Sequence, residues 1–549
     1  MSLSSALARI LAPLGAGLLI LAPLDAAVSA SAAAAPSGTQ WVTKPLPAAA
    51  GTGLGRNQDG EPGLGVTPTG QLWTASDIAP YAAGDPRVDP AAGLLSGADV
   101  WTSTDGGRTY KWLSDPFAEA ANSPGLAGED TDLAVANAKN SDGFYNVYVT
   151  SLWVGASGLA WSSDGGKTWK LNRLGGVPTQ DRPWLAADGA CTVYLGFHQL
   201  PSFTPVFATY DVCSNGDVPV GGGAAIDPVN ETLLSLSDFP GLSGSFNKFV
   251  VDTSPTSKWQ HSIYQPMSLC RVQGPTDLLT NATASSGCPV GTQYLLAVSR
   301  DGGQTFSYHP VVNDPSGATL VWAATVATDA AGTVYFTWSD SKNSYLDVSR
   351  DGGVTWSKSM QLNAPHTAAV YPTVAGGKAG RVDVAWYGTT RGGDSNDAKV
   401  MGKPNATGAA PWRVYVARST NSGGTFSTRA VSAPVHRGEL CTHGSGCSDT
   451  DSRNLLDDFG LVISPTTGLD SVVFTDDQPQ GHGATAYTAY ASEVAPTTTR
   501  HTSHSPKTGA TGASSGPSLA ATGGTLAPAA AGITLLGAAA LLRRRQRSA

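Results

Sequence analysis

Acidic residues, an arginine and a tyrosine occur in short phrases that each stand just before a strand-like run. The phrases are GEPG with Glu61, GEDTD with Asp130, QDRPW with Asp181 and Arg182, VYPT with Tyr371, and LLDDFG with Asp458. Two carboxylates ~5–9 Å apart can split a glycosidic bond, one as an acid and the other as a base or nucleophile. An arginine among them can hold a carboxylate bidentately. The opposing interpretation is that acidic residues simply favour strand starts that face water.

A second set of residues repeats too regularly to be read as chemistry first. The phrase Ser-x-Asp-x-Gly-x-Thr-aromatic occurs as STDGGRTY from Ser103, SSDGGKTW from Ser162, SRDGGQTF from Ser299 and SRDGGVTW from Ser349, with a fifth copy, STNSGGTF, from Ser419. Asp-Gly supplies the positive-φ positions of a tight turn, and the Asp side chain accepts backbone N–H groups. We therefore predict that Asp105, Asp164, Asp301, Asp351 and Asn421 are structural, because an amide can replace a turn acceptor but not a general acid.

A fainter repeat lies upstream of these phrases and predicts the fold class. Strand–turn–strand units begin near Leu64, Leu133, Leu185, Ala224, Val326, Thr373 and Leu461. Two consecutive hairpins make one four-stranded antiparallel blade, and blades repeated radially make a β-propeller. The sequence thus predicts an all-β propeller of six or seven blades, in which the last run, ATAYTAYASEV, closes the ring. In such a fold the acidic phrases above converge on one face around the central channel.

Composition limits the kind of partner and the compartment. The 549 residues carry a net charge of −8, which argues against nucleic acid as a partner. No phosphate-binding loop, dinucleotide fingerprint or nucleophile elbow is present, so we expect no cofactor. The six cysteines indicate disulfides in an exported chain, and we expect neighbours in the sequence to pair. Their spacing does not match a zinc site.

The repeated phrase resembles the Asp box of the sialidase superfamily and related propellers, and the resemblance covers the chain from about Trp41 to Val494. It implies the propeller fold but no single reaction, since Asp boxes also occur in plant-wall hydrolases, sorting receptors and non-catalytic propellers. A sialidase would use three arginines for the substrate carboxylate, a Glu-activated tyrosine as nucleophile and an aspartate as acid/base. The family's Phe-Arg-Ile-Pro phrase is absent, and the order of its tyrosine is not kept here.

The resemblance suggests roles for particular residues. The arginines that could take part in substrate binding are Arg56, Arg182, Arg391 and Arg453, and Tyr371 is the tyrosine in the expected slot. Trp184 could stack on a sugar ring if it is exposed, or pack between blades if it is not. Two functions follow: an exo-acting glycoside hydrolase of the exo-α-sialidase type, or a non-catalytic propeller that binds carbohydrate or protein. We expect a monomer.

Both ends of the chain resemble targeting signals. Residues 1–32 have Arg9, an apolar run and small residues, as in a cleaved signal peptide. Residues 495–518 are rich in Ser, Thr, Pro and Gly and predict a disordered stalk after a folded body at 39–494. The end, 519–549, resembles a sortase sorting signal: an LAATG motif with Leu519, Thr522 and Gly523, an apolar run and an Arg-rich tail. This implies sortase and cell-wall peptidoglycan as partners, and a place at the surface of a bacterial, actinobacterial-type cell. A short membrane anchor is the alternative at either end.

One further short segment has residues that could bind a metal ion. SDTDSRNLLDD, with Asp449 and Asp451, offers the hard oxygen ligands that Ca²⁺ takes. It lacks the glycine and the terminal glutamate of a helix-loop-helix calcium loop. A solvated acidic loop is therefore the favoured interpretation, and we assign no metal.

Overall fold

The computed structural model describes residues 38–496, with gaps at 52, 54–56, 79–96, 118–127, 154–155, 173–179, 200–203, 215, 217, 225–244, 247, 271–290, 317–323, 444–446, 448–449, 456–458 and 479–485. The described residues belong to one compact unit. The predicted signal peptide and sorting signal, and nearly all of the predicted stalk, lie outside the described residues. None of the helices in the described ranges is long and apolar enough to cross a membrane.

The unit is built from seven antiparallel sheets, which we number as blades 1–7 in chain order. From the inner strand outward, blade 1 consists of β2 (Gly60–Val66), β3 (Leu72–Asp77), β4 (Ala98–Ser103) and β5 (Lys111–Ser114), and blade 2 consists of β6 (Glu129–Lys139), β7 (Tyr145–Trp153), β8 (Ala156–Ser162) and β9 (Lys170–Asn172). Blade 3 consists of β10 (Gln180–Asp188), β11 (Thr192–Gln199), β12 (Thr204–Asp211) and β13 (Gly221–Ala224). Blade 4 consists of β14 (Ser245–Phe246) with β15 (Val250–Val251), then β16 (Ile263–Cys270), β17 (Thr292–Ser299) and β18 (Ser307–Asp314).

Blades 5–7 follow the same plan. Blade 5 consists of β19 (Ala324–Thr328), β20 (Val334–Ser339), β21 (Ser344–Ser349) and β22 (Met360–Gln361). Blade 6 consists of β23 (Ala368–Gly376), β24 (Val382–Thr389), β25 (Pro411–Ser419) and β26 (Ser427–Ala430), with β27 (His436–Arg437) added beside β25. Blade 7 consists of β28 (Gly460–Ile463), β29 (Asp470–Asp476), β30 (Tyr487–Val494) and β1 (Gln40–Pro45). The described helices are short: α2 (Ala398–Met401) and the 3₁₀ helix η6 (Thr450–Arg453).

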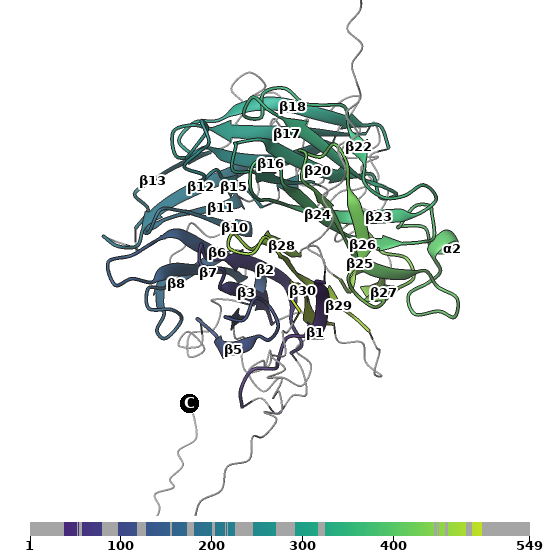
Figure 1. Ribbon diagram of the computed structural model, residues 1–549, viewed down its shortest axis with the longest axis horizontal. Coiled ribbons are helices and arrows are strands. Elements are labelled where there is room, and N and C mark those ends of the chain that lie inside the picture. Colours follow the sequence, from purple (N-terminus) through teal and green to yellow (C-terminus); the bar gives the residue numbers. More distant parts are fainter. Residues whose placement is uncertain are drawn as a thin grey trace, which may run out of the picture. The chain divides into compact units, whose positions relative to one another are not determined.

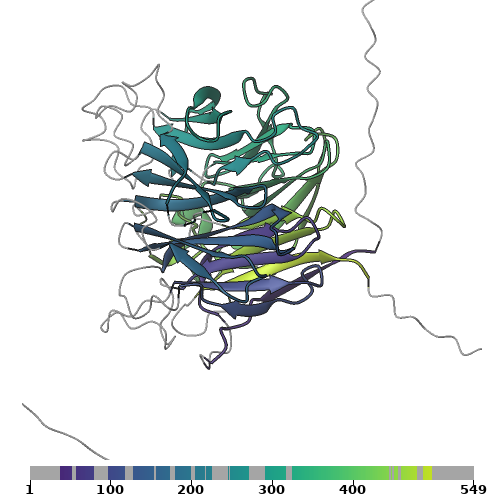
Figure 2. The same ribbon diagram turned by 90° about the vertical axis from the view of Figure 1, so that its left-hand side faces the viewer.

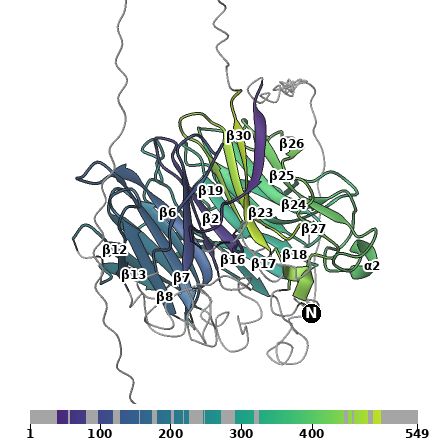
Figure 3. The same cartoon turned by 90° about the horizontal axis from the view of Figure 1, so that it is seen from below.

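The blades form a closed ring, as the sequence predicts (Figure 1). The inner strand of each blade contacts the inner strands of the blades before and after it, and β28 of the last blade contacts β2 of the first. The ring is closed within blade 7, where the N-terminal strand β1 pairs with the C-terminal strand β30, Gln40 opposite Val494. Figures 2 and 3 show this purple and yellow pair side by side. The number of blades is seven, the upper of the two predicted values.

One predicted hairpin is wrongly placed. The unit expected from Ala224 is not the inner hairpin of blade 4, because Ala224 ends β13, the outer strand of blade 3. The inner strands of blade 4 are instead the short β14 and β15, which both pair with β16. The error arises because blade 3 has no Asp-box phrase to mark where it ends.

The second strands of the blades show why this sequence makes a propeller. β20 reads VYFTWS and β24 reads VDVAWYGT, and every residue of both is buried. Such continuous burial requires cover on both faces of the sheet, which neighbouring blades supply. The outer strand β26, STRA, is exposed throughout. Each blade therefore changes from apolar to polar with distance from the centre.

The five Asp-box phrases form turns between the third and fourth strands of blades 1, 2, 4, 5 and 6. In each of the four copies with aspartate the carboxylate accepts the Ser hydroxyl two residues before it and both the backbone N–H and hydroxyl of the Thr four residues after it. In blade 6, Asn421 accepts the same Ser and backbone groups, but its amide donates to the hydroxyl of Thr425. The side chain at this position holds a turn in every copy.

Partial burial of these carboxylates opposes their ionisation, but the hydrogen bonds from Thr and Ser outweigh it. The pKa values of Asp164 and Asp351 fall to about 2 as a result. Each such carboxylate adds stability above its ordinary pKa of 3.8, and this contribution is lost as the pH falls through the folded-state value.

We expect Asp351→Ala to lower the free energy of unfolding by about 1 kcal/mol or more, because it leaves backbone N–H groups of the turn without an acceptor. Asp351→Asn, which copies the turn at Asn421, should cost less at neutral pH and should flatten the loss of stability between pH 3.8 and about 2. Urea denaturation at several pH values measures both. Equal costs for Ala and Asn would contradict the turn-acceptor role.

A buried ion network joins blades 6 and 7 at the same end of the strands as the Asp-box turns. Arg418 contacts Asp470 and Glu493, each at 2.5 Å, and Arg381 contacts Asp383 at 2.5 Å and Asp470 at 3.1 Å. Three carboxylates share two guanidinium groups, so one carboxyl group is left short of positive charge. Burial, and then the neighbouring Asp383, raise the pKa of Asp470 well above its usual range.

Candidate functional site

Four inner strands begin with the same irregularity. β2, β6, β10 and β23 each shift register against the second strand of their blade within their first residues, which marks a β-bulge. At each bulge a residue other than glycine has positive φ: Glu61 (47°), Asp130 (31°), Arg182 (60°) and Tyr371 (53°). Such conformations are strained, persist only where the surroundings enforce them, and cluster at functional sites. All four residues were selected from the sequence by their phrases.

Three of these bulges bring their side chains together. The Nη1 atom of Arg182 lies 3.2 Å from Oδ1 of Asp130 and 4.0 Å from Oε1 of Glu61. The three residues come from three consecutive blades, and the side chains of Arg182 and Asp130 remain 18 and 19 % exposed. We call them the bulge cluster. It is partly accessible to solvent through Arg182 and Asp130, and it joins a cation to two carboxylates.

The spacing of the two carboxylates is bounded by this geometry. Because both oxygens approach the same nitrogen, they can be no farther apart than the sum of 3.2 and 4.0 Å. Retaining glycosidases place their carboxyl groups ~5–5.5 Å apart and inverting ones ~6.5–9.5 Å apart. This upper limit on the separation of the two oxygens is compatible with the retaining distance and with the lower end of the inverting range.

The central channel below the cluster is narrow. Its cavity of about 120 Å³ is lined by inner-strand residues of six blades, among them Gly63, Asp132, Thr373 and Gly460. At about 30 Å³ for each water, this space suits a few water molecules rather than a sugar ring. A glycan would therefore have to bind above the channel, at the level of the bulges.

A lysine that sequence reasoning missed closes one side of this channel. Lys248, just before β15, places Nζ 2.6 Å from Oδ1 of Asp132, whose Oδ2 accepts the backbone N–H of Leu185 at 2.8 Å. Burial raises the pKa of Asp132, and the charge of Lys248 opposes the rise. Asp132 and Leu185 lie two and three residues beyond Asp130 and Arg182. The contacts of Asp132 with Lys248 and with the backbone of Leu185 thus fix β6 against β10 next to the bulge cluster. No local pattern around Lys248 could have revealed it.

Tyr371 takes a different role from its three counterparts. It is 3 % exposed, and its hydroxyl donates to the backbone carbonyl of Cys441 at 2.9 Å. Cys441 is joined to Cys447 by a disulfide. The bulge of blade 6 thus anchors the loop that carries this disulfide, and the phenol of Tyr371 is hydrogen-bonded to the backbone of that loop.

A buried pair supports the same loop. His436 and Asp477 are both fully buried, with Nδ1 and Oδ2 2.7 Å apart, and Nε2 of His436 lies 2.9 Å from the carbonyl of Glu439. Both ring nitrogens thus face acceptors, which suits the imidazolium. Burial lowers the pKa of His436, but the charge of Asp477, aided by Asp451, outweighs this effect and raises it.

Two of the remaining sequence-predicted residues, Trp184 and Arg391, have other contacts. Trp184 is 4 % exposed and lies in the core, the alternative that the sequence left open. Arg391 donates to the carbonyls of Val400, Met401 and Gly408 around α2. Arg453 ends η6 and is half-buried. Arg56, Asp458 and the side chain of Asp181 lie outside what the structure describes.

The cysteines pair as neighbours where they are described. Cys191 pairs with Cys213 and Cys441 with Cys447. Among the described residues, one group of three potential metal-ligating side chains is close enough to share an ion: Cys191, Asp211 and Cys213. Because its two thiols form a disulfide, the group does not have the ligands of a metal site. Cys288 and Asp449 lie outside the described residues.

No protein-family model matches the sequence, and no curated protein matches it. Solved structures are similar over most of the chain. An α-L-arabinofuranosidase of Fusarium graminearum is 12 % identical, with 83 % of this chain and 97 % of that chain covered and a TM-score of 0.39. A leech intramolecular trans-sialidase is 12 % identical (80 and 68 % covered, TM-score 0.35), and a xyloglucanase from Xanthomonas campestris is 14 % identical (82 and 55 % covered, TM-score 0.42). At these values the neighbours carry no argument about activity, so the chain's own residues must supply it.

The His436–Asp477 pair predicts a dependence of stability on pH. Because the folded-state pKa of His436 is raised above 6.5, its contribution is complete below that pH and is lost as the pH rises through the folded-state value. The free energy of unfolding of the wild type should therefore fall as the pH rises above 6.5, and His436→Asn should flatten this change. Urea denaturation across this range tests the idea, with the exposed His366→Asn as control. An unchanged slope in His436→Asn would contradict it.

Proposed function

We propose that this chain is an extracellular, glycan-acting propeller, and that it is a glycoside hydrolase whose carboxylate pair is Glu61 and Asp130. One observation carries the proposal: a guanidinium group lies within 3.2 and 4.0 Å of two carboxylates that three strained bulges direct to one place. The same kind of bulge occurs in β23, but there Tyr371 donates to a backbone carbonyl, whereas the bulges of β2, β6 and β10 bring charged side chains together.

The two carboxylates differ in their surroundings, and this suggests their roles. Glu61 is the more buried, with 8 % of its side chain exposed, and lies farther from the guanidinium than Asp130. We assign the proton donor to the glycosidic oxygen to Glu61, and the base or nucleophile to Asp130, which Arg182 holds in place. Arg182 would also stabilise charge on a substrate. The sugar would lie over the bulges, where the cluster is exposed.

An exo-α-sialidase remains one specific form of this proposal. It would require two further arginines beside Arg182, and Arg391 is engaged around α2. Arg56 and Arg453 are the sequence candidates for the other two. An enzyme on a sugar without a carboxylate needs only the pair and one positioning group, which the bulge cluster contains. The geometry therefore favours a two-carboxylate glycosidase over a sialidase.

The test is hydrolysis of a panel of aryl glycosides, including an α-sialoside and an α-L-arabinofuranoside, by purified protein. We expect Asp130→Asn and Arg182→Ala to lower kcat/KM by about 100-fold or more, because each removes a group that acts on the transition state. Glu61→Gln should lose most activity on poor leaving groups and little on activated ones, since only the former need protonation. Asp142→Asn, on an exposed turn at the far end of β6, is the matched control.

The alternative function is a non-catalytic propeller that binds carbohydrate or protein. Absence of turnover by the wild type on every substrate, with glycan binding that Arg182→Ala abolishes, would favour this alternative. Equal turnover by wild type and Asp130→Asn would remove the bulge cluster from the chemistry altogether. Thermal denaturation of each variant separates these results from simple loss of fold.

We also propose that the chain is exported and joined to the bacterial cell wall, on the evidence of the signal-like residues 1–32 and the LAATG motif. The geometry of the propeller is compatible with this. The chain leaves β30 at Val494, beside the Asp-box turn of blade 1, where Arg108 donates to the carbonyl of Ala495. Glu61 lies at the opposite end of the strands, since β3 pairs Leu72 with Ser103 of that turn and Asp77 with Gly60. A tether at the C-terminus would thus leave the bulge cluster facing outward.

Thr522→Ala should shift the protein from the wall fraction to the membrane or the medium, because a sortase-type transpeptidase joins the wall at that threonine. Cell fractionation with immunoblotting measures the shift. The control is Thr508→Ala in the stalk. Unchanged wall attachment of Thr522→Ala would leave the tail-anchor alternative.

A further inference from the structure

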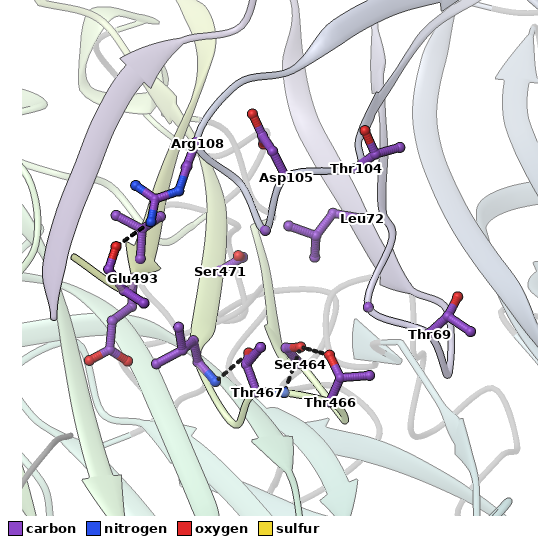
Figure 4. Close-up of a pocket in the computed structure, with 15 residues that line it drawn as sticks. Thr69, Leu72, Thr104, Asp105, Arg108, Ser464, Thr466, Thr467, Ser471 and Glu493 are labelled. Carbon is purple, nitrogen blue, oxygen red and sulfur yellow. Dashed lines mark hydrogen bonds between the residues drawn. The ribbon is translucent and has the colours of Figure 1, made fainter. Parts of the chain in front are cut away.

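A second cavity lies on the Asp-box face, away from the bulge cluster. It has a volume of about 290 Å³ and lies in the seam between blades 1 and 7 (Figure 4). Its walls are the β2–β3 turn with Thr69, the Asp-box turn with Thr104 and Arg108, and the β28–β29 turn with Thr466 and Thr467. Its volume is at the lower end of ligand-sized pockets, ~300–1,000 Å³. We call it the seam pocket.

Hydroxyl-bearing side chains supply much of the polar lining of this pocket. The side chains of Thr69, Thr104, Thr466, Thr467 and Ser471 surround it in Figure 4, and the four threonines are exposed. A hydroxyl both donates and accepts hydrogen bonds and can rotate to suit its partner. A set of such groups around a small cavity matches the hydroxyls of a sugar better than it matches an apolar ligand.

The charges that line the pocket are not equally available. Glu493 already holds Arg418 at 2.5 Å and the hydroxyl of Thr39 at 2.6 Å, and Asp105 holds Ser103 and Thr109. Arg108 is different, because within the described part of the chain its guanidinium donates only to the carbonyl of Ala495. A guanidinium has five N–H donors. The capacity that remains for a charged ligand is therefore cationic.

We propose that the seam pocket is a second saccharide-binding site, and that it takes a sugar bearing a carboxylate. The Arg108 guanidinium would pair with the carboxylate, and Thr104, Thr466 and Thr467 would hydrogen-bond to the hydroxyls of the ring. The site is separate from the bulge cluster, since β3 spans about 17 Å between the two faces. It does not depend on hydrolysis at that cluster.

Two kinds of polymer contain such a sugar. Bacterial wall glycan contains muramic acid, whose lactyl carboxylate is free where no stem peptide is attached, and many other extracellular glycans contain a uronic acid. The wall is the nearer source under the proposed anchoring, because 27 residues separate Ala495 from Gly523 and a flexible chain of that length spans roughly 30 Å. Tethering at that distance raises the effective concentration of wall glycan at this face.

The test is titration calorimetry of the purified chain, stalk included, with three disaccharides. Two are acidic: N-acetylglucosamine joined to N-acetylmuramic acid, and N-acetylglucosamine joined to glucuronic acid. The third is the neutral disaccharide of N-acetylglucosamine. We expect at least one acidic disaccharide to bind with a Kd of roughly 1 mM or tighter, and the neutral one at least about 10-fold more weakly. Which acidic sugar binds better distinguishes the wall from another source.

Two variants assign the binding to the pocket. Arg108→Met should weaken acidic disaccharide binding by about 10-fold or more, as expected for the loss of a charged hydrogen-bond partner. Thr104→Tyr should block the pocket from its exposed rim without removing a charge, which covers the case in which Arg108→Met disturbs the chain exit. Arg429→Met, on the exposed strand β26, is the matched control.

Three results would overturn the proposal. They are no binding of either acidic disaccharide at about 10 mM, equal binding of acidic and neutral disaccharides, or wild-type binding by both Arg108→Met and Thr104→Tyr. Loss of binding in Arg182→Ala alone would place the sugar at the bulge cluster instead. None of these results depends on whether the chain hydrolyses a glycoside.

Discussion

The structure depends on closure of the ring by the pairing of β1 with β30. Six register pairs, from Gln40 with Val494 to Pro45 with Ala489, join the first described strand of the chain to its last. Blades such as those of β20 and β24 are buried on both faces, which is possible only if every blade has a neighbour on each side. A strand contributed from the other end of the chain supplies the final cover. The buried network of Arg418, Asp470 and Glu493 lies beside this closure and ties blade 7 to blade 6.

Closure also sets the geometry of the candidate site. The inner strands converge only in a closed ring, so the bulges of β2, β6 and β10 can meet although Glu61 and Arg182 are 121 positions apart in the chain. Asp132 and Lys248 hold two of these strands in register just below the cluster. The narrow channel beneath limits a ligand to the outer surface of the cluster. The positive φ values at the bulges are the local cost of turning three side chains toward one point.

The two faces of the propeller differ in chemistry. The face with the bulges carries the partly exposed Arg182 and Asp130 and the buried Glu61, together with the loop held by Tyr371 and His436. The opposite face carries the Asp-box turns, whose carboxylates are held by their own Ser and Thr residues and are not available to a ligand. In the seam pocket on that face, the Arg108 guanidinium donates to the carbonyl of Ala495 and has further N–H donors for a ligand. If the chain is tethered beside this pocket, the face with the Asp-box turns would be directed toward the tether and the face with the bulges away from it.

The sequence by itself determined the fold class and the role of its most conspicuous motif. Turn chemistry depends on residues a few positions apart, so the phrase from Ser103 and its copies could be interpreted locally, and Asn421 showed that an acid is not required. The phrases around Glu61, Asp130, Arg182 and Tyr371 were also visible, because a bulge leaves proline and charged residues at a strand start.

Only the tertiary structure decided which of these residues meet. It placed Asp130 and Glu61 around Arg182, turned Tyr371 to a backbone carbonyl and buried Trp184. It also revealed Lys248, His436 and the seam pocket, which have no local signature. The physical reason is that contacts between blades join residues far apart in the chain. Their register depends on the closed ring, which no short stretch of sequence contains.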